Sequence, residues 1–323
     1  MVRMGMRFVD LHCDTLTRDD DDILRTSQGH INLDKLKRGG AWVQFFALFI
    51  PTGREASERP GGFLEPHAFY ERYRAVWQRE MAANADAVAP AADMDDIRAN
   101  TAAGRISAVL SVEDAAALEG RLERVDELYA DGVRLMTLTW NHENELAWPH
   151  AAEPERMRRG LKPFGVEVVR RMNELGMIVD VSHLSDGGFA DVARVSSAPF
   201  VASHSCARSL SGHTRCLTDA QLRILGDKGG VVGVNFCPRF LREGSLHTTI
   251  DDVVRHALHI RDKAGVEALA LGSDFDGVPG TLEFEDYAGL PRLADALERH
   301  VGSAEMDKIC SGNALRLMSE VWR

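Results

Sequence analysis

The sequence predicts one domain, residues 1–323, with the fold of a (β/α)8 barrel. The first observation is that eight short apolar runs alternate with longer helical patterns along the chain. The second is that most of these runs are continuously apolar, which is typical of parallel strands covered on both faces. The third is composition: 45% hydrophobic and 27% charged residues suit a large soluble core. Barrels of ~250 residues or more commonly form a single domain.

The elements are expected in a regular β–α order. Strands are expected at residues 7–11, 42–50, 106–111, 133–139, 177–181, 200–203, 230–235 and 268–273. Helices are expected at residues 65–87, 94–103, 122–130, 163–175, 186–195, 218–228 and 250–264. Consecutive β–α units with right-handed crossovers place the eight strands in one parallel barrel.

Local signals support the ends of several elements. Ser185 and Thr218 are cap-type residues at the start of predicted helices, and Pro163 stands in a first turn, where proline is tolerated. The Gly/Pro-rich stretch 51–62 is expected to form a loop at the mouth of the barrel. Glycines stand between a helix and the next strand, a position that favours a left-handed backbone, at Gly104, Gly132, Gly176 and Gly265.

Charge and cysteine content narrow the classes of partner. A formal net charge of −11 argues against nucleic acid, which is bound by clustered Lys and Arg. No segment reaches the ~18 consecutive apolar residues of a membrane span, and residues 1–5 carry no apolar leader. The five cysteines are odd in number and include no CxxC pair, which indicates reduced thiols. We therefore expect a cytoplasmic protein without a nucleic-acid or membrane partner.

Metal-capable side chains stand at the carboxyl ends of five predicted strands. His12 and Asp14 occupy positions i and i+2, so they point the same way if the first strand alternates. Any one such residue could be an ordinary polar residue at a loop start. Five strand ends that all supply His, Asp or Glu to the active-site face of a barrel are hard to attribute to chance. The residues are His12, Asp14, Glu113, His183, His204 and Asp274.

This set can hold two divalent ions if the glutamate bridges them. His12, Asp14 and one oxygen of Glu113 would bind the first ion. The other oxygen of Glu113, with His183 and His204, would bind the second. A hydroxide shared between ions ~3.5–4 Å apart would attack a carbonyl that the metals polarise. The aspartate after the eighth strand is then the expected proton carrier to the leaving amine.

The motifs around these residues resemble those of the membrane (renal) dipeptidase family of amidohydrolase-type barrels. They are HxD at 12–14, SxE at 111–113, VSH at 181–183, SHS at 203–205 and G-x-DFDG at 272–277, and the likeness runs on to GNALRL at 312–317. Related deaminase and dihydroorotase branches typically begin with HxH instead. The resemblance implies two zinc ions on the five ligands and Asp274 as the catalytic acid/base. It also implies that Arg215 binds the substrate carboxylate, for which a guanidinium is well suited.

Two positions depart from the family pattern. Trp140 replaces a histidine that follows the fourth strand in the best-known members, and His142 is a weaker candidate for the same substrate contact. Cys237 stands where some relatives carry an aromatic residue. Both changes leave the metal ligands intact and affect substrate specificity. Of the remaining histidines, His213 is interpreted as a loop residue, and His150 has no companion ligand nearby in the sequence.

The leading hypothesis is a binuclear zinc dipeptidase that uses a metal-bridging hydroxide. The resemblance suggests tolerance for a D-residue at the C-terminal position of the dipeptide, and a homodimer. The same metal site could instead open a lactam, a lactone or another small amide, with Trp140 reshaping the pocket. A third possibility is a non-hydrolytic accessory protein of a biosynthetic pathway. The complete ligand set and Asp274 make that possibility the weakest.

Overall fold

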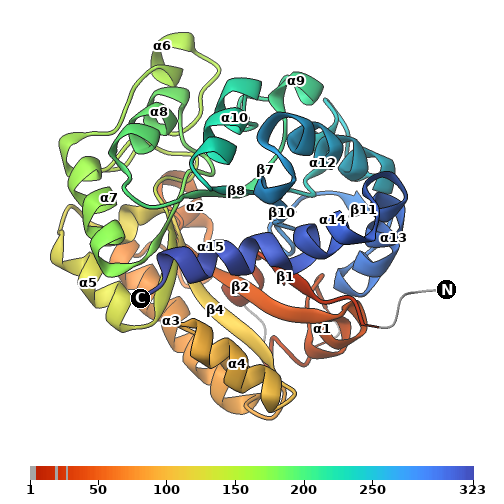
Figure 1. Cartoon of the computed structure of the whole chain (residues 1–323). Coiled ribbons are helices and arrows are strands. Elements are labelled where there is room, and N and C mark those ends of the chain that lie inside the picture. The colour runs from red at the N-terminus through yellow and green to blue at the C-terminus, as the bar shows by residue number, and fades with distance from the viewer. Residues whose placement is uncertain (1–4, 19–20, 27) are drawn as a thin grey trace.

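The computed structural model describes residues 5–18, 21–26 and 28–323, so most of the N-terminal stretch 1–5 lies outside the described residues. Eight parallel strands close into a barrel surrounded by helices (Figure 1). The closing contacts join β2 to β4 and β1 to β10. All eight predicted strands are confirmed, as β1 (Phe8–Asp10), β2 (Ala41–Phe49), β4 (Ile106–Glu113), β5 (Val133–Thr137), β6 (Ile178–Asp180), β7 (Val201–Ser205), β8 (Val231–Val234) and β10 (Leu269–Leu271).

The predicted helices are also present, with the expected end signals. Thr218 and Gln221 form a capping box, Ser185 Oγ accepts a hydrogen bond from the backbone N–H of Gly188, and Gly176 ends its helix with a φ of 83°. The helices are α3 (Pro66–Ala83), α4 (Met94–Ala102), α5 (Glu123–Ala130), α7 (Pro163–Leu175), α8 (Asp186–Val195), α10 (Asp219–Asp227) and α12 (Ile250–Ala264).

The expectation of a loop throughout residues 51–62 is wrong, because α2 (Gly53–Glu58) forms inside this stretch. An Arg54–Glu58 ion pair, four residues apart, supports this single helical stretch. The patterns also leave other short or terminal elements unpredicted. These are α1 (Leu33–Gly39), α6 (Pro154–Met157), α9 (Arg208–Ser211), α11 (Pro238–Leu241), α13 (Leu290–Val301), α14 (Ser303–Asp307), α15 (Asn313–Val321), β3 (Val88–Pro90), β9 (His247–Thr248) and β11 (Thr281–Leu282).

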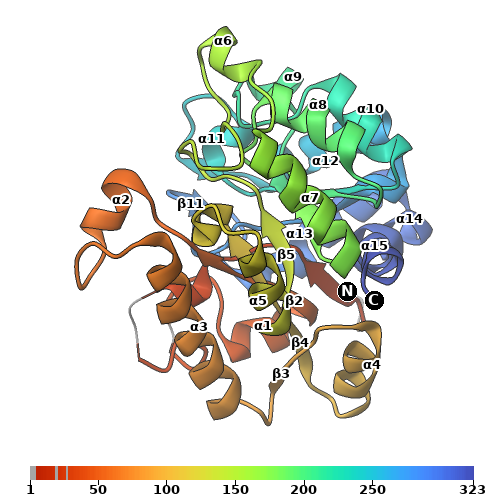
Figure 2. The same cartoon turned by 90° about the vertical axis from the view of Figure 1, so that its left-hand side faces the viewer.

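The barrel interior is a packed core that α15 closes at one end. Leu317 and Trp322 pack with residues from the inner faces of the strands, such as Val9 and Phe45. Arg316 donates a hydrogen bond to the Gly229 carbonyl, just before β8 begins, so α15 covers the amino-terminal ends of the strands. In the side view of Figure 2, α15 and α2 lie toward opposite ends of the barrel. The carboxyl ends of the strands are therefore the open end.

Two further observations bear on the sequence-based expectations. All five cysteines are buried and free of disulfides. No helix within the described ranges is both long enough and apolar enough to cross a membrane.

Candidate metal centre

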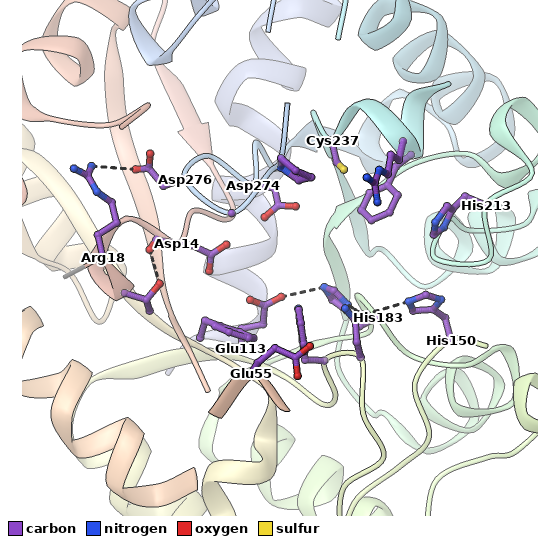
Figure 3. A pocket seen from close by; sticks show the side chains of 18 of the residues that line it. Asp14, Arg18, Glu55, Glu113, His150, His183, His213, Cys237, Asp274 and Asp276 are labelled. Carbon is purple, nitrogen blue, oxygen red and sulfur yellow. Dashed lines mark hydrogen bonds and ion pairs between the residues drawn. The ribbon is translucent and has the colours of Figure 1, made fainter. Parts of the chain in front are cut away.

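The carboxyl ends of the strands surround a cavity of about 870 Å³. Asp14, Glu113, His183 and Asp274 line it, and Figure 3 shows these four side chains directed toward a common space. His12 and His204 are almost completely buried and contact the same group. The structure therefore brings together all six residues that the sequence singles out.

The first group of donors lies between β4, β6 and β7. Glu113 Oε1 is 3.0 Å from His183 Nε2 and 3.3 Å from His204 Nε2. The two imidazole nitrogens are themselves 3.0 Å apart. Ligands ~2.0–2.1 Å from one tetrahedral zinc ion stand ~3.3 Å from one another. These three atoms therefore have the spacing of ligands to a single ion.

Hydrogen bonds to the other ring nitrogens place the protons of both imidazoles. His183 Nδ1 donates to Asn141 Oδ1 at 3.0 Å. His204 Nδ1 donates to Ser203 Oγ at 2.7 Å, because that hydroxyl already donates to Asp180 Oδ2 at 2.5 Å. Each Nε2 is therefore unprotonated, and its lone pair faces the Nε2 of the other imidazole and Oε1 of Glu113. A cation among these atoms turns that repulsion into coordination, so the residues fit a divalent metal.

The second group of donors centres on His12. Its Nε2 lies 3.6 Å from Glu113 Oε2, 3.8 Å from Asp14 Oδ1 and 3.9 Å from Asp274 Oδ1, all too far for hydrogen bonds. Both ring nitrogens of His12, and Asp14 Oδ1, have no hydrogen-bond partner among the described residues. Buried polar atoms are normally paired. These orphaned atoms around the second oxygen of Glu113 fit a second cation.

Without metals, the environment of Glu113 and Asp274 favours their protonated forms. Burial and the charge of Asp14 raise the pKa of Glu113 to about 8 and that of Asp274 to about 7. Burial lowers the pKa of His12, but the charges of Glu113 and Asp14 outweigh burial and raise it well above the usual value. Bound cations would take the place of these protons.

A buried aspartate at the end of β1 aligns one side of the centre. Asp10 Oδ1 accepts from the backbone N–H groups of Ser273 (2.8 Å) and His12 (3.4 Å). Asp10 Oδ2 accepts from the Ser273 hydroxyl (2.6 Å) and from Gln44 Nε2 (3.0 Å). These bonds tie β1 to the chain that follows β10. They hold His12 and the residue after Ser273, which is Asp274, at fixed positions.

The end of β6 repeats this scheme on the other side. Asp180 Oδ1 accepts from the backbone N–H groups of Ser182 and Ser203, both at 2.9 Å. Asp180 Oδ2 accepts from the hydroxyls of Ser203 (2.5 Å) and Thr137 (2.7 Å). The residue after Ser203 is His204. The sequence analysis did not assign a role to either aspartate.

Unusual backbone conformations concentrate beside the ligands. His183 and Asp274 have φ angles of 68° and 60°, a region that non-glycine residues rarely adopt and that is common at functional sites. A Cβ atom at Gly277 would lie 1.9 Å from Asp14 Oδ2 and 2.7 Å from Asp274 Oδ1. The last glycine of the DFDG motif is therefore required by the close approach of two carboxylates.

Arg215 lies beside His204, one of the candidate metal ligands. Its Nη2 donates to the His204 carbonyl at 2.9 Å, and its guanidinium carbon is 5.7 Å from the centre of the Phe240 ring. Only 4% of the residue is exposed, and its Nε has no partner among the described residues. The arginine thus keeps an unused donor close to the metal ligands.

The two candidates after the fourth predicted strand take different positions. The strand, β5, ends at Thr137, so its alternation does not extend to His142. Trp140 lines the cavity and packs edge-on against Phe49, with ring centres 4.7 Å apart. His142 Nε2 is 2.9 Å from Glu55 Oε2, and it is Glu55 of this pair that lines the cavity.

Other cavity residues come from loops that the sequence patterns did not single out. His150 and His213 both line the cavity, with ring centres 6.0 Å apart. The His150 backbone N–H donates to the His183 carbonyl at 2.7 Å. Burial, followed by the charge of Arg215, lowers the pKa of His150 to about 3, so its imidazole is neutral. No periodic pattern marks such residues, because long loops bring them to the site.

Comparison with known proteins gives the family. The chain matches the profile described as membrane dipeptidase, peptidase family M19, over residues 2–323. It belongs to this family. The protein is accordingly an M19 metallo-dipeptidase, a hydrolase built on a single (β/α)8 barrel domain.

Individual relatives agree with this M19 assignment. The chain is 30% identical over 297 residues to "Dipeptidase tcpJ" of Claviceps purpurea, covering 91% of this chain and 69% of that protein. It is 35% identical over 303 residues to an uncharacterized dipeptidase of Schizosaccharomyces pombe, covering 91% and 72%. A Rhodobacter sphaeroides metallopeptidase, solved with a phosphinate mimic of the dipeptide L-Ala-D-Ala, superposes with a TM-score of 0.86 at 28% identity, covering 98% and 99%.

Proposed function

We propose that this M19 dipeptidase works with two zinc ions and accepts dipeptides that carry a D-residue at the C-terminal position. The observation that carries the metal count is the pair of donor groups that share Glu113. One group presents two facing imidazole lone pairs, and the other leaves His12 and Asp14 without protein partners. The mixture of imidazole and carboxylate ligands suits zinc. When bound, the two ions would polarise the scissile carbonyl and lower the pKa of a water molecule between them.

Asp274 is the proposed proton carrier. Asn235 Nδ2 donates to its Oδ2 at 2.8 Å, which holds the side chain in place and leaves Oδ1 toward the cluster. Oδ1 would take the proton of the attacking water and pass it to the leaving amine nitrogen. Burial and the charge of Asp14 raise the pKa of Asp274 to about 7 in the metal-free protein, within the range where a carboxyl can both accept and donate a proton.

Arg215 is the proposed partner of the substrate carboxylate. Burial disfavours an isolated charge, so a guanidinium with an unused Nε donor gains from an anionic ligand. The Rhodobacter sphaeroides relative was solved with a mimic of L-Ala-D-Ala, which supports a dipeptide with a free carboxylate and a D-residue. The homodimer and the cytoplasmic location stay predictions, which sedimentation and cell fractionation test.

Metal analysis and a substrate panel test the proposed function together. Protein purified without chelator and reconstituted with zinc should contain close to two equivalents. It should hydrolyse both L-Xaa-D-Xaa and L-Xaa-L-Xaa dipeptides. A reproducible content of one equivalent or less contradicts the bridging role of Glu113. Two equivalents with turnover only of lactams or lactones would favour the alternative hydrolase function.

A double-mutant cycle tests Arg215. A partly desolvated contact between charged groups contributes roughly 1.5–3 kcal/mol, so Arg215→Ala should lower kcat/KM for a free dipeptide by ~10–150-fold. The matching dipeptide amide has already lost the contact, so its kcat/KM should change little. If the losses caused by the substitution and by amidation simply add, Arg215 does not bind the carboxylate.

A further inference from the structure

The cavity contains an arginine that the proposed reaction does not use. Arg239 lies in α11, is exposed and lines the cavity. It also lines, with His213 and Glu243, a neighbouring hollow of about 330 Å³. The Arg239 side chain makes no hydrogen bond or ion pair with any residue in the described ranges, Glu243 included. The site thus presents a guanidinium whose charge is not neutralised by the protein.

The other exposed or half-buried arginines of the cavity differ in this respect. Arg18 Nη1 donates to the Gln28 carbonyl at 3.0 Å and lies 3.8 Å from Asp276 Oδ2. The guanidinium of Arg59 lies 5.1 Å from the centre of the Phe49 ring. Both have protein contacts that explain their positions. The Arg239 guanidinium has no such contact among the described residues, so it is available to an anionic ligand in the cavity.

Arg239 lies on the same side of the cavity as Arg215. The charges of both arginines lower the pKa of His213, after burial. Phe240, the residue after Arg239, lies beside both His213 and Arg215. The centre of its ring is 4.8 Å from that of His213, and the Arg215 guanidinium contacts the same ring. Two guanidinium groups therefore lie near His213 and Phe240, the buried one of Arg215 and the exposed one of Arg239, and of the two only Arg239 lines the cavity.

We propose that Arg239 is a specificity-determining residue that binds an acidic side chain on the C-terminal residue of the dipeptide. The inference rests on the proposed function, in which Arg215 binds the α-carboxylate of that residue. An aspartyl or glutamyl residue carries a second carboxylate a few bonds from the first. The deeper arginine then meets the α-carboxylate, and the outer arginine meets the side chain.

The test compares two substrates that have nearly the same shape and differ in charge. Zinc-loaded enzyme should hydrolyse Ala-Asp with a kcat/KM about 5- to 20-fold higher than Ala-Asn, with the C-terminal residue in whichever configuration the enzyme prefers. This range corresponds to one charge-assisted contact that stays partly solvated. Arg239→Gln should remove the preference by lowering kcat/KM for Ala-Asp alone. The change should lie mainly in KM, because the contact is present before and during the reaction.

Two further variants distinguish a direct contact between Arg239 and the substrate from the overall positive charge of the cavity. Arg239→Lys should restore part of the preference for Ala-Asp, because it restores the charge without the planar fork. Arg59→Gln removes a different cavity arginine and the same charge, and should leave the Ala-Asp to Ala-Asn ratio within about twofold. Equal losses of selectivity in Arg59→Gln and Arg239→Gln would overturn the inference.

The outcomes also distinguish this inference from the function on which it rests. If the wild-type enzyme hydrolyses Ala-Asn as efficiently as Ala-Asp, the role of Arg239 is wrong and the dipeptidase function stands. If Arg239→Gln lowers kcat/KM for both peptides equally, Arg239 does not read the side chain. If neither peptide nor any other dipeptide is hydrolysed, the proposed function and this inference both fail.

Discussion

At the β1–β10 edge of the metal centre, Asp10 accepts four hydrogen bonds, and at the β6–β7 edge Asp180 does the same. Each aspartate accepts hydrogen bonds from the backbone N–H and the hydroxyl of a serine, Ser273 just after β10 or Ser203 within β7. Each serine immediately precedes a residue of the centre. The two edges therefore use the same scaffold to fix their side chains.

The side chains that the two edges present are nevertheless different. The β1–β10 edge supplies Asp14 and Asp274 with a single imidazole, and burial and the charge of Asp14 raise the pKa of Asp274 to about 7. The β6–β7 edge supplies the imidazoles of His183 and His204, whose pKa values burial holds well below the usual value. The same backbone scheme thus supports an acidic half, which can hold a proton at Asp274, and a neutral half, whose imidazoles present lone pairs. We therefore expect acid/base chemistry from the first half and metal coordination by neutral imidazoles from the second, with Glu113 shared between them.

The largest expected effect is on kcat, from a substitution in the acidic half that should stop proton transfer but leave metal binding intact. Asp274→Asn should lower kcat by ~10²–10⁴-fold, the usual scale for loss of a general acid/base. The zinc content should stay close to that of the wild type, because the remaining donors still surround both positions. Metal analysis and kinetics on the same preparation check this. Loss of an ion in proportion to activity would show that Asp274 is a ligand, which its 3.9 Å distance from His12 Nε2 also allows.

A comparable but smaller loss is expected from the neutral half. His183→Ala removes one of the two facing lone pairs, so one zinc equivalent should be lost and activity should fall by more than ~10²-fold. Circular dichroism should show that the barrel stays folded. A variant that keeps two ions, or loses less activity than this, would place His183 outside the metal centre.

The convergence of six candidate residues could be predicted because the barrel brings strand ends together whatever the loops do. The carboxyl ends of parallel strands meet at one face, so His12 and His204 are brought together although 192 positions separate them. Asp10 and Asp180 could not be assigned roles in this way. Their hydrogen bonds depend on which residue each strand places opposite them, such as Leu271 opposite Asp10, and the sequence does not reveal that register.

Residues from long loops were harder to predict for a different reason. His150 and Glu55 reach the cavity through irregular segments and a short helix, whose paths depend on tertiary contacts. No periodicity of 2.0 or 3.6 residues marks them. The same limit applies to His142, whose distance from the end of β5 removes the alternation on which its predicted contact depended.

An intermediate effect should appear in the pH dependence of metal binding, because Glu113 places one carboxylate oxygen in each half of the centre. Its pKa is about 8 in the metal-free folded protein, against a usual value of 4.5. The folded state therefore holds a proton that the unfolded chain releases, and this group's contribution to stability falls as pH rises from 4.5 to 8. Zinc binds the deprotonated form, so apparent affinity should weaken roughly tenfold per pH unit below 8. The gain in Tm from zinc should accordingly be larger at pH 8 than at pH 6.

Calorimetric titrations in buffers of different ionisation enthalpy measure the protons released on zinc binding. Release should be greatest near pH 6 and should fall toward pH 9. Glu113→Gln provides the control, since it removes this titrating group together with one of the charges that raise the pKa of His12, and it should weaken the pH dependence of whatever zinc binding remains. Affinity that is constant between pH 6 and 8 in the wild type would contradict the shared carboxylate.

The smallest expected effect tests whether the two scaffold aspartates are equivalent. In Asp180→Asn, the new Nδ2 faces the hydroxyls of Thr137 and Ser203, which can rotate to accept its hydrogens. In Asp10→Asn it faces Gln44 Nε2, a donor that also bonds the Phe45 carbonyl at 3.0 Å and cannot turn without losing that bond. An unsatisfied buried group costs about 1–3 kcal/mol, so Asp10→Asn should lower the free energy of unfolding by about 2–3 kcal/mol and Asp180→Asn by about 1 kcal/mol. Urea unfolding of both variants without metal measures the difference. If both substitutions lower the free energy of unfolding equally, hydroxyl and amide partners stabilise the two halves of the centre to the same extent.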